Sequence, residues 1–153
     1  MKARPILFAT DFSPASGAAL RQALALARTE GATLLVAHVV EPPVPFAPDG
    51  YVLPQIYDDL AAAQRRGAEE RMRRILARAR RDGVAARGLL LRGAPHEAIA
   101  RTARGHRAGR VVVGTHGRRG FRRLFLGSVA ARVVASSPCP VLVVPARRER
   151  RTR

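Results

Sequence analysis

Residues 111–129 read VVVGTHGRRGFRRLFLGSV, which is a short apolar run, then a basic loop with glycines, then the start of a helix. The run of valines is typical of a strand that is buried on both faces. The glycines let the backbone approach a ligand closely, and Ser128 offers a hydroxyl beside the free N–H groups of a helix start. Because such N–H groups bind anions, this stretch predicts a phosphate-binding loop on an α/β sheet.

Strand-like runs and helix-like segments alternate along the rest of the chain. Continuous aliphatic runs predict strands at residues 6–9, 33–40, 85–91, 111–113 and 141–144. Apolar residues at helical spacing predict helices between residues 14 and 31, between 58 and 81, after Pro95, and from Ser128 onward. Strands that are aliphatic throughout are typical of parallel sheets with helices on both faces. The sequence therefore predicts a doubly wound α/β fold with a five-stranded parallel sheet.

Three local features give more detailed expectations. We expect Ser13 to cap the first helix, with Pro14 at its first position. The prolines between Glu41 and Tyr57 predict a long loop, and loops of that length are often functional. In the last helix we expect three valines to face the core, namely Val129, Val133 and Val134.

Length and composition limit the class of protein. A chain of 153 residues with 47% hydrophobic residues has the size of a single globular domain. No apolar run approaches the ~20 residues that cross a bilayer, and the first residues lead directly into a strand, so we expect a cytoplasmic protein without membrane contact. Cys139 is the only cysteine, which excludes an intramolecular disulfide and indicates a packing role.

The formal net charge of +17 raises the question of an anionic partner. Lys2 is the only lysine, so arginine carries nearly all of the positive charge. The basic tail at residues 147–153 has a net charge of +4, which leaves +13 spread over the rest of the chain. This distribution favours diffuse surface charge, with non-specific polyanion binding as the alternative.

The spacing around the basic loop is Gly114-x-x-Gly117, then nine residues, then Gly127-Ser128. This pattern resembles the ATP-binding signature of the universal stress protein family. Residues 9–13, Ala-Thr-Asp-Phe-Ser, are similar to the first-strand motif of the same family. The resemblance implies a protein that binds an adenine nucleotide and responds to stress.

The resemblance extends over nearly the whole chain, with the family domain at residues 1–146 and a tail at 147–153. It implies a Rossmann-like, adenine nucleotide alpha hydrolase-like fold with strand order 3-2-1-4-5. In that order the first and fourth strands are neighbours at a switch point, where ligands of open α/β sheets bind. Residues 137–144 resemble the closing strand of the family, which relatives pair across a two-fold axis. We therefore expect a homodimer through Val141–Val144, which would also cover an aliphatic edge strand.

The resemblance also assigns candidate ligand contacts. A carboxylate at Asp11 could bind ribose hydroxyls or a hydrated Mg²⁺, or it could instead cap the entry to the first helix. The backbone of Val39 would meet the adenine ring, and we expect backbone amides to hold the phosphates more than any single arginine. The candidate nucleotide-binding residues are Thr10, Asp11, Val39, Val113, Gly114, His116, Gly117, Arg118, Gly127, Ser128 and Val129.

These features favour a nucleotide-dependent switch that binds ATP together with Mg²⁺. Two alternatives are a dimeric scaffold without nucleotide and a slow ATPase, for which His116 or Asp11 would have to act as the base. Other nucleotide motifs are absent from the sequence. No Gly-x-Gly-x-x-Gly follows the first strand, and no Gly-Lys-Ser/Thr of a Walker loop is present. No spacing of histidine and cysteine indicates zinc.

Overall fold

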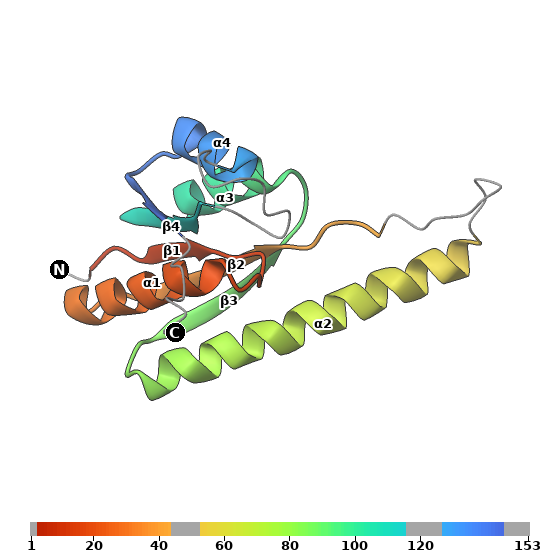
Figure 1. Cartoon of the computed structure of the whole chain (residues 1–153), viewed down its shortest axis with the longest axis horizontal. Coiled ribbons are helices and arrows are strands. Elements are labelled where there is room, and N and C mark those ends of the chain that lie inside the picture. The colour runs from red at the N-terminus through yellow and green to blue at the C-terminus, as the bar shows by residue number, and fades with distance from the viewer. Residues whose placement is uncertain (1–2, 44–52, 116–126, 146–153) are drawn as a thin grey trace, which may run out of the picture.

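The computed structural model describes residues 3–43, 53–115 and 127–145. The described strands are β1 (Ile6–Ala9), β2 (Leu34–Val39), β3 (Ala86–Leu91), β4 (Arg110–Gly114) and β5 (Val141–Val144). They form one parallel sheet in the order β3-β2-β1-β4-β5 (Figure 1). The predicted doubly wound fold and its strand order are confirmed.

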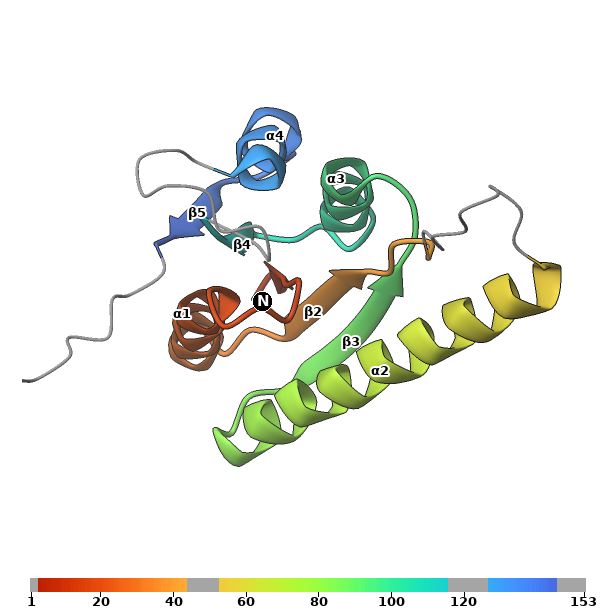
Figure 2. The same cartoon turned by 45° about the vertical axis from the view of Figure 1, so that its right-hand side comes forward.

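Helices cover both faces of this sheet. The described helices are α1 (Ser16–Glu30), α2 (Pro54–Arg81), α3 (Pro95–Gly105) and α4 (Ser128–Ser136). In Figure 2, α1 and α2 lie on one side of the sheet, and α3 and α4 lie on the other. The central strands β1 and β4 are therefore buried from two directions, which explains their aliphatic residues, whereas the edge strands β3 and β5 are partly exposed.

Successive residues of the central strands pack into two separate cores. Ile6 and Phe8 of β1 belong to the core under α1 and α2, and both side chains are fully buried. Leu7, between them, belongs to the core under α3 and α4. In β4, Val112 packs with the first core, whereas Val111 and Val113 pack with the second. This alternation, which has the two-residue period of a strand, ties both helix layers to the same sheet.

The first helix begins later than the sequence predicts. Helix α1 starts at Ser16 after a turn at residues 14–15, and its first cap position is Ala15, without a side-chain cap. Ser13 contributes its backbone carbonyl, which accepts hydrogen bonds from the N–H and the hydroxyl of Ser16. The cap that was predicted at Ser13 is therefore wrong, because a hydrogen-bonded turn after β1 takes its place.

Two further predictions need correction. Helix α2 begins at Pro54, inside the segment predicted as a loop, because proline lacks only an N–H that the first helical position leaves unpaired anyway. In α4, Val133 is fully buried as predicted, but Val129 is 43% exposed and Val134 is 48% exposed. Only a narrow face of this short helix packs on the core, and Ala130 and Val133 form that face at i,i+3 spacing.

Helix α2 is longer than the sheet that it covers. Its buried residues are Ala68, Met72 and Ala79, all in the second half of the helix. The first half extends past the sheet in both views (Figures 1 and 2). No helix within the described ranges is both long enough and apolar enough to span a bilayer.

The contact between α2 and β3 gives a test of the packing. A Cβ added at Gly88 of β3 would lie 2.6 Å from Met72 Cγ and 2.9 Å from Met72 Sδ. Gly88→Ala should therefore lower the free energy of unfolding by about 1–3 kcal/mol through overpacking. Gly67→Ala is the matched control on the exposed side of α2, where an added Cβ meets nothing within 4 Å.

The control should raise the free energy of unfolding by about 0.5–1 kcal/mol, because alanine favours the helix over glycine. Urea unfolding of both variants measures the two changes. Equal stabilisation by the two substitutions would contradict the packing of α2 on β3.

Candidate functional site at the ends of the first and fourth strands

The candidate site lies where β1 and β4 end side by side. Their register pairs Phe8 with Val112, so Thr10 and Gly114, two residues further on, leave the sheet as neighbours. The chain then continues from β1 into α1 on one face of the sheet and from β4 toward α4 on the other. This divergence produces the switch point that the sequence predicts, and such crevices are where doubly wound sheets bind ligands.

A network of short hydrogen bonds fixes the chain after β1. The Phe12 N–H donates to Thr10 Oγ1 at 2.9 Å, and the Ser13 N–H donates to Asp11 Oδ1 at 3.0 Å. The hydroxyls of Thr10 and Ser16 lie 3.0 Å apart, and both side chains are buried. Asp11 thus takes part in a local turn that precedes α1 without capping it, and the turn holds its carboxyl group at the end of β1.

Phe12 has an uncommon backbone conformation in this turn. Its φ angle is 60°, in the left-handed region that side chains larger than glycine rarely adopt. The ring packs on His38 of β2 with centroids 4.2 Å apart, and His38 Nδ1 lies 2.8 Å from the Thr10 carbonyl oxygen. Surrounding contacts therefore hold the strained residue, and such backbone outliers cluster at functional sites.

Hydrogen bonds fix the backbone on each side of the basic loop, at Thr115 after β4 and at Gly127 before α4. The Thr115 N–H donates to the Val144 carbonyl of β5 at 3.0 Å, and the Gly127 N–H donates to the Thr115 carbonyl at 2.7 Å. Helix α4 begins at the next residue, Ser128, with no side-chain cap. The first N–H groups of a helix have no partner within the helix, and together they attract an anion.

The structure describes most of the predicted contacts. Thr10, Asp11 and Gly114 come together at the strand ends, and Val39 lies half-buried at the end of β2. Val113 is 5% exposed in the core under α3 and α4, so a ligand could reach little more than its backbone. Gly127, Ser128 and Val129 form the start of α4, where Ser128 and Val129 are exposed. His116, Gly117 and Arg118 lie outside the described residues.

The site also contains contributors that the sequence reasoning did not assign. Phe12, Ser13 and Ser16 build the turn, and His38 joins it to β2. The three-residue spacing of Thr10, Ser13 and Ser16 is visible in the sequence, but the left-handed conformation of Phe12 has no sequence signal. No cluster of three or more metal-ligating side chains occurs in the described part of the chain.

Comparison with known proteins identifies the family of this chain. Residues 2–145 match the model of the universal stress protein family. A universal stress protein of Thermus aquaticus is 39% identical over 150 residues, which is 92% of this chain and 98% of the relative.

Two similar solved structures contain nucleotides. One is a universal stress protein in complex with cAMP, with 26% identity, a TM-score of 0.70 and coverage of 94% of this chain and 98% of the other. The second, from Archaeoglobus fulgidus in complex with dAMP, shares the fold at 24% identity and a TM-score of 0.65, with coverage of 94% and 99%. The family match over nearly the whole chain shows that this chain belongs to the universal stress protein family.

Proposed function

We propose that this protein binds ATP with Mg²⁺ at the ends of β1 and β4, and that it acts in the cytoplasm as a nucleotide-dependent stress-response switch. The observation that carries the proposal is the pairing of a rigid turn after β1 with the uncapped start of α4 across the switch point. The proposal is supported by the family of this chain and by the two similar solved structures that contain an adenine nucleotide.

Each part of the nucleotide has a counterpart at the site. The phosphates would bind the N–H groups of the glycine loop and the first turn of α4, where the helix dipole favours negative charge. The ribose would lie near Asp11 and the adenine near the backbone of Val39, as the family resemblance implies. The hydrogen bond from the Gly127 N–H to the Thr115 carbonyl holds the start of α4 beside the end of β4, so the N–H groups of its first turn need little reorganisation when a phosphate binds.

The chemistry of the site is compatible with Mg²⁺ that arrives with the phosphates. Magnesium keeps several waters and usually takes one or two protein carboxylates plus phosphate oxygens. Asp11 supplies one carboxylate at this edge, and the described residues hold no group of three metal ligands. Asp11 would therefore hold the ion through its hydration shell or directly, and the ion would screen the phosphate charge.

The same hydrogen bonds offer a route from the nucleotide to a dimer surface. Thr115 begins the loop and donates to Val144, the last residue of β5. Strand β5 is an edge of the sheet, and its Leu142 is 38% exposed. Exposed Val129 and Val134 lie on α4, which packs against β5. We propose that the homodimer forms through Val141–Val144 and that occupancy of the loop changes this contact.

The first test measures nucleotide binding. Nucleotide-free protein should unfold at higher temperature with ATP and Mg²⁺, because a ligand at 100 times its Kd adds about 2.7 kcal/mol to the free energy of unfolding. Gly117→Val should remove the shift, since a branched side chain keeps the loop backbone from the phosphates. Gly67→Val, which makes the same change on the exposed side of α2, should keep it. No shift in the parent protein at millimolar ATP would leave the dimeric scaffold as the function.

The second test separates the two roles of Asp11. Asp11→Asn keeps a side-chain oxygen that can accept the Ser13 N–H bond but removes the negative charge. We expect near-parental stability without ligand and loss of the Mg²⁺-dependent part of the ATP affinity, as measured by calorimetry with and without EDTA. An unchanged response to Mg²⁺ would show that Asp11 serves the turn alone.

The third test concerns the edge strand. Leu142→Lys places a charge on the exposed edge of β5 and should convert a dimer into a monomer in light scattering after size exclusion. Leu60→Lys is the control, because Leu60 is similarly exposed, at 40%, but lies on α2. Dissociation by the control and not by Leu142→Lys would place the dimer contact elsewhere.

A further inference from the structure

A hollow lies between α1 and α2, on the face of the sheet opposite α3 and α4. Its volume is about 340 Å³, at the lower end of the roughly 300–1,000 Å³ of ligand pockets. Residues from the end of β1, the start of α1 and the second half of α2 line it, namely Phe8, Thr10, Phe12, Ser13, Ser16, Gly17, Leu20, Arg71, Arg74 and Ile75. The hollow shares Thr10 and the turn of Phe12, Ser13 and Ser16 with the nucleotide site proposed above, whereas its residues from α2 do not belong to that site.

The inner wall combines apolar side chains with one uncommitted hydroxyl. The Phe12 N–H donates to Thr10 Oγ1, the Thr10 and Ser16 hydroxyls bond to each other, and Ser16 Oγ donates to the Ser13 carbonyl. The hydroxyl protons of Thr10 and Ser16 are therefore both used in hydrogen bonds within the protein. Ser13 Oγ is buried and has no hydrogen-bond partner within the described residues. A buried hydroxyl without a partner is costly, and a ligand oxygen would satisfy it.

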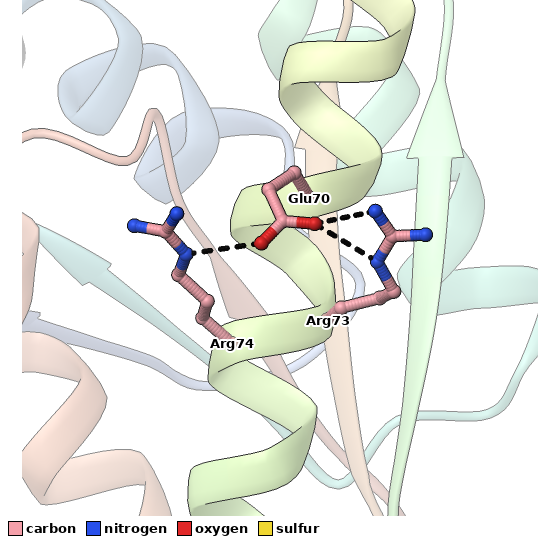
Figure 3. A network of polar contacts seen from close by, with 3 residues as sticks. All are labelled: Glu70, Arg73 and Arg74. Atoms are coloured by element: carbon pink, nitrogen blue, oxygen red, sulfur yellow. Dashed lines mark hydrogen bonds and ion pairs between the residues drawn. The ribbon is translucent and has the colours of Figure 1, made fainter.

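The outer wall carries two arginines one helical turn apart on α2. Arg74 Nε donates to Glu70 Oε1 at 3.2 Å, and Glu70 also accepts hydrogen bonds from Arg73 (Figure 3). The hydrogen bond from Arg73, and after it the hydrogen bond from Arg74, lowers the pKa of Glu70 below its usual range. This carboxylate therefore stays ionised at neutral pH. Arg71 has no ion-pair partner in the described ranges. The rim of the hollow therefore has an excess of positive charge.

A separate hollow lies further along the same two helices. This smaller hollow of about 110 Å³ is lined by Arg21, Leu24, Ala25, Arg28, Arg78 and Asp82. It has no hydroxyl among its lining residues, and Asp82 lies 3.8 Å from Arg78. The larger hollow is therefore the better site for an anion, because it joins cations, a free hydroxyl and an apolar wall.

We propose that the groove between α1 and α2 binds a phosphate monoester carried on an apolar body, independently of the nucleotide site. The phosphate, which carries close to two negative charges at pH 7.5, lies between the guanidinium groups of Arg71 and Arg74 and accepts a hydrogen bond from Ser13. The apolar body packs on Phe12, Leu20 and Ile75. Arg71 supplies a positive charge without an ion-pair partner in the described ranges, Arg74 supplies a second one that it shares with Glu70, and the apolar wall adds affinity that inorganic phosphate lacks.

The test uses 1-naphthyl phosphate as the probe, with inorganic phosphate and 1-naphthol as its two halves. Calorimetry at pH 7.5 and low salt should give one site for 1-naphthyl phosphate and much weaker binding of either half. Higher ionic strength should weaken the binding, because the arginines are exposed to screening. Equal affinity for inorganic phosphate, or tighter binding of 1-naphthoate than of 1-naphthyl phosphate, would overturn the assignment of the ligand class.

Matched variants locate the site. The double variant Arg71→Gln and Arg74→Gln should raise the Kd about tenfold or more, because charge-assisted bonds to the phosphate are lost. Arg73→Gln is the control: Arg73 shares the same Glu70 carboxylate but does not line the hollow. It should leave the Kd within about twofold. An equal loss of affinity in the control would show diffuse attraction and overturn the site.

A cavity-filling variant gives a second readout that does not depend on charge. An added Cβ at Gly17 meets only Arg21 Nη1, at 3.9 Å, and leucine favours a helix more than glycine does. Gly17→Leu should therefore fold at least as stably as the parent and lose binding of 1-naphthyl phosphate. Parental binding by this variant, or displacement of the probe by saturating ATP, would contradict a separate site in the groove.

Discussion

The pairing of β1 with β2 on one side and with β4 on the other is the constraint on which the rest of the structure depends. It forces the chain to leave β1 toward one face of the sheet and β4 toward the other, so their ends meet with no helix between them. The same pairing places Phe8 and Leu7, adjacent in sequence, in two different cores. Loss of this strand contact would remove both cores and the crevice together.

The turn after β1 serves both sides of the sheet. Its backbone and the Asp11 carboxyl group lie at the strand ends, while the side chains of Thr10, Ser13 and Ser16 face the space between α1 and α2. The left-handed backbone conformation of Phe12 lets the turn serve both sides of the sheet. It changes the direction of the chain sharply while the Phe12 ring stays packed on His38. The strained backbone at this one residue thereby directs neighbouring residues of the turn to two different surfaces, the strand ends and the space between α1 and α2.

The sheet was predictable because short runs of valine and leucine, such as residues 111–113, are typical of buried strands. Helix starts were less predictable. Pro54 and Ser13 each fit two local structures, and tertiary contacts made the choice. The inward face of α4 was overestimated because Val129 and Val134 are apolar, although only Ala130 and Val133 reach the core.

The candidate contacts at the strand ends followed from the resemblance to the family's motifs, which also implied the strand order. The groove between α1 and α2 could not be foreseen in this way, because Ser13 and Arg71 are far apart in sequence and only packing brings them to one hollow.

The hydrogen bond from Gly127 to Thr115 closes the chain on either side of residues 116–126. Within the described residues, this bond joins the start of α4 directly to the residue that follows β4. We expect changes in length or sequence between Thr115 and Gly127 to disturb the described scaffold less than changes within β4 or α4. For the proposed nucleotide site, this means that evolution can alter ligand preference between Thr115 and Gly127 while the scaffold is inherited with little change.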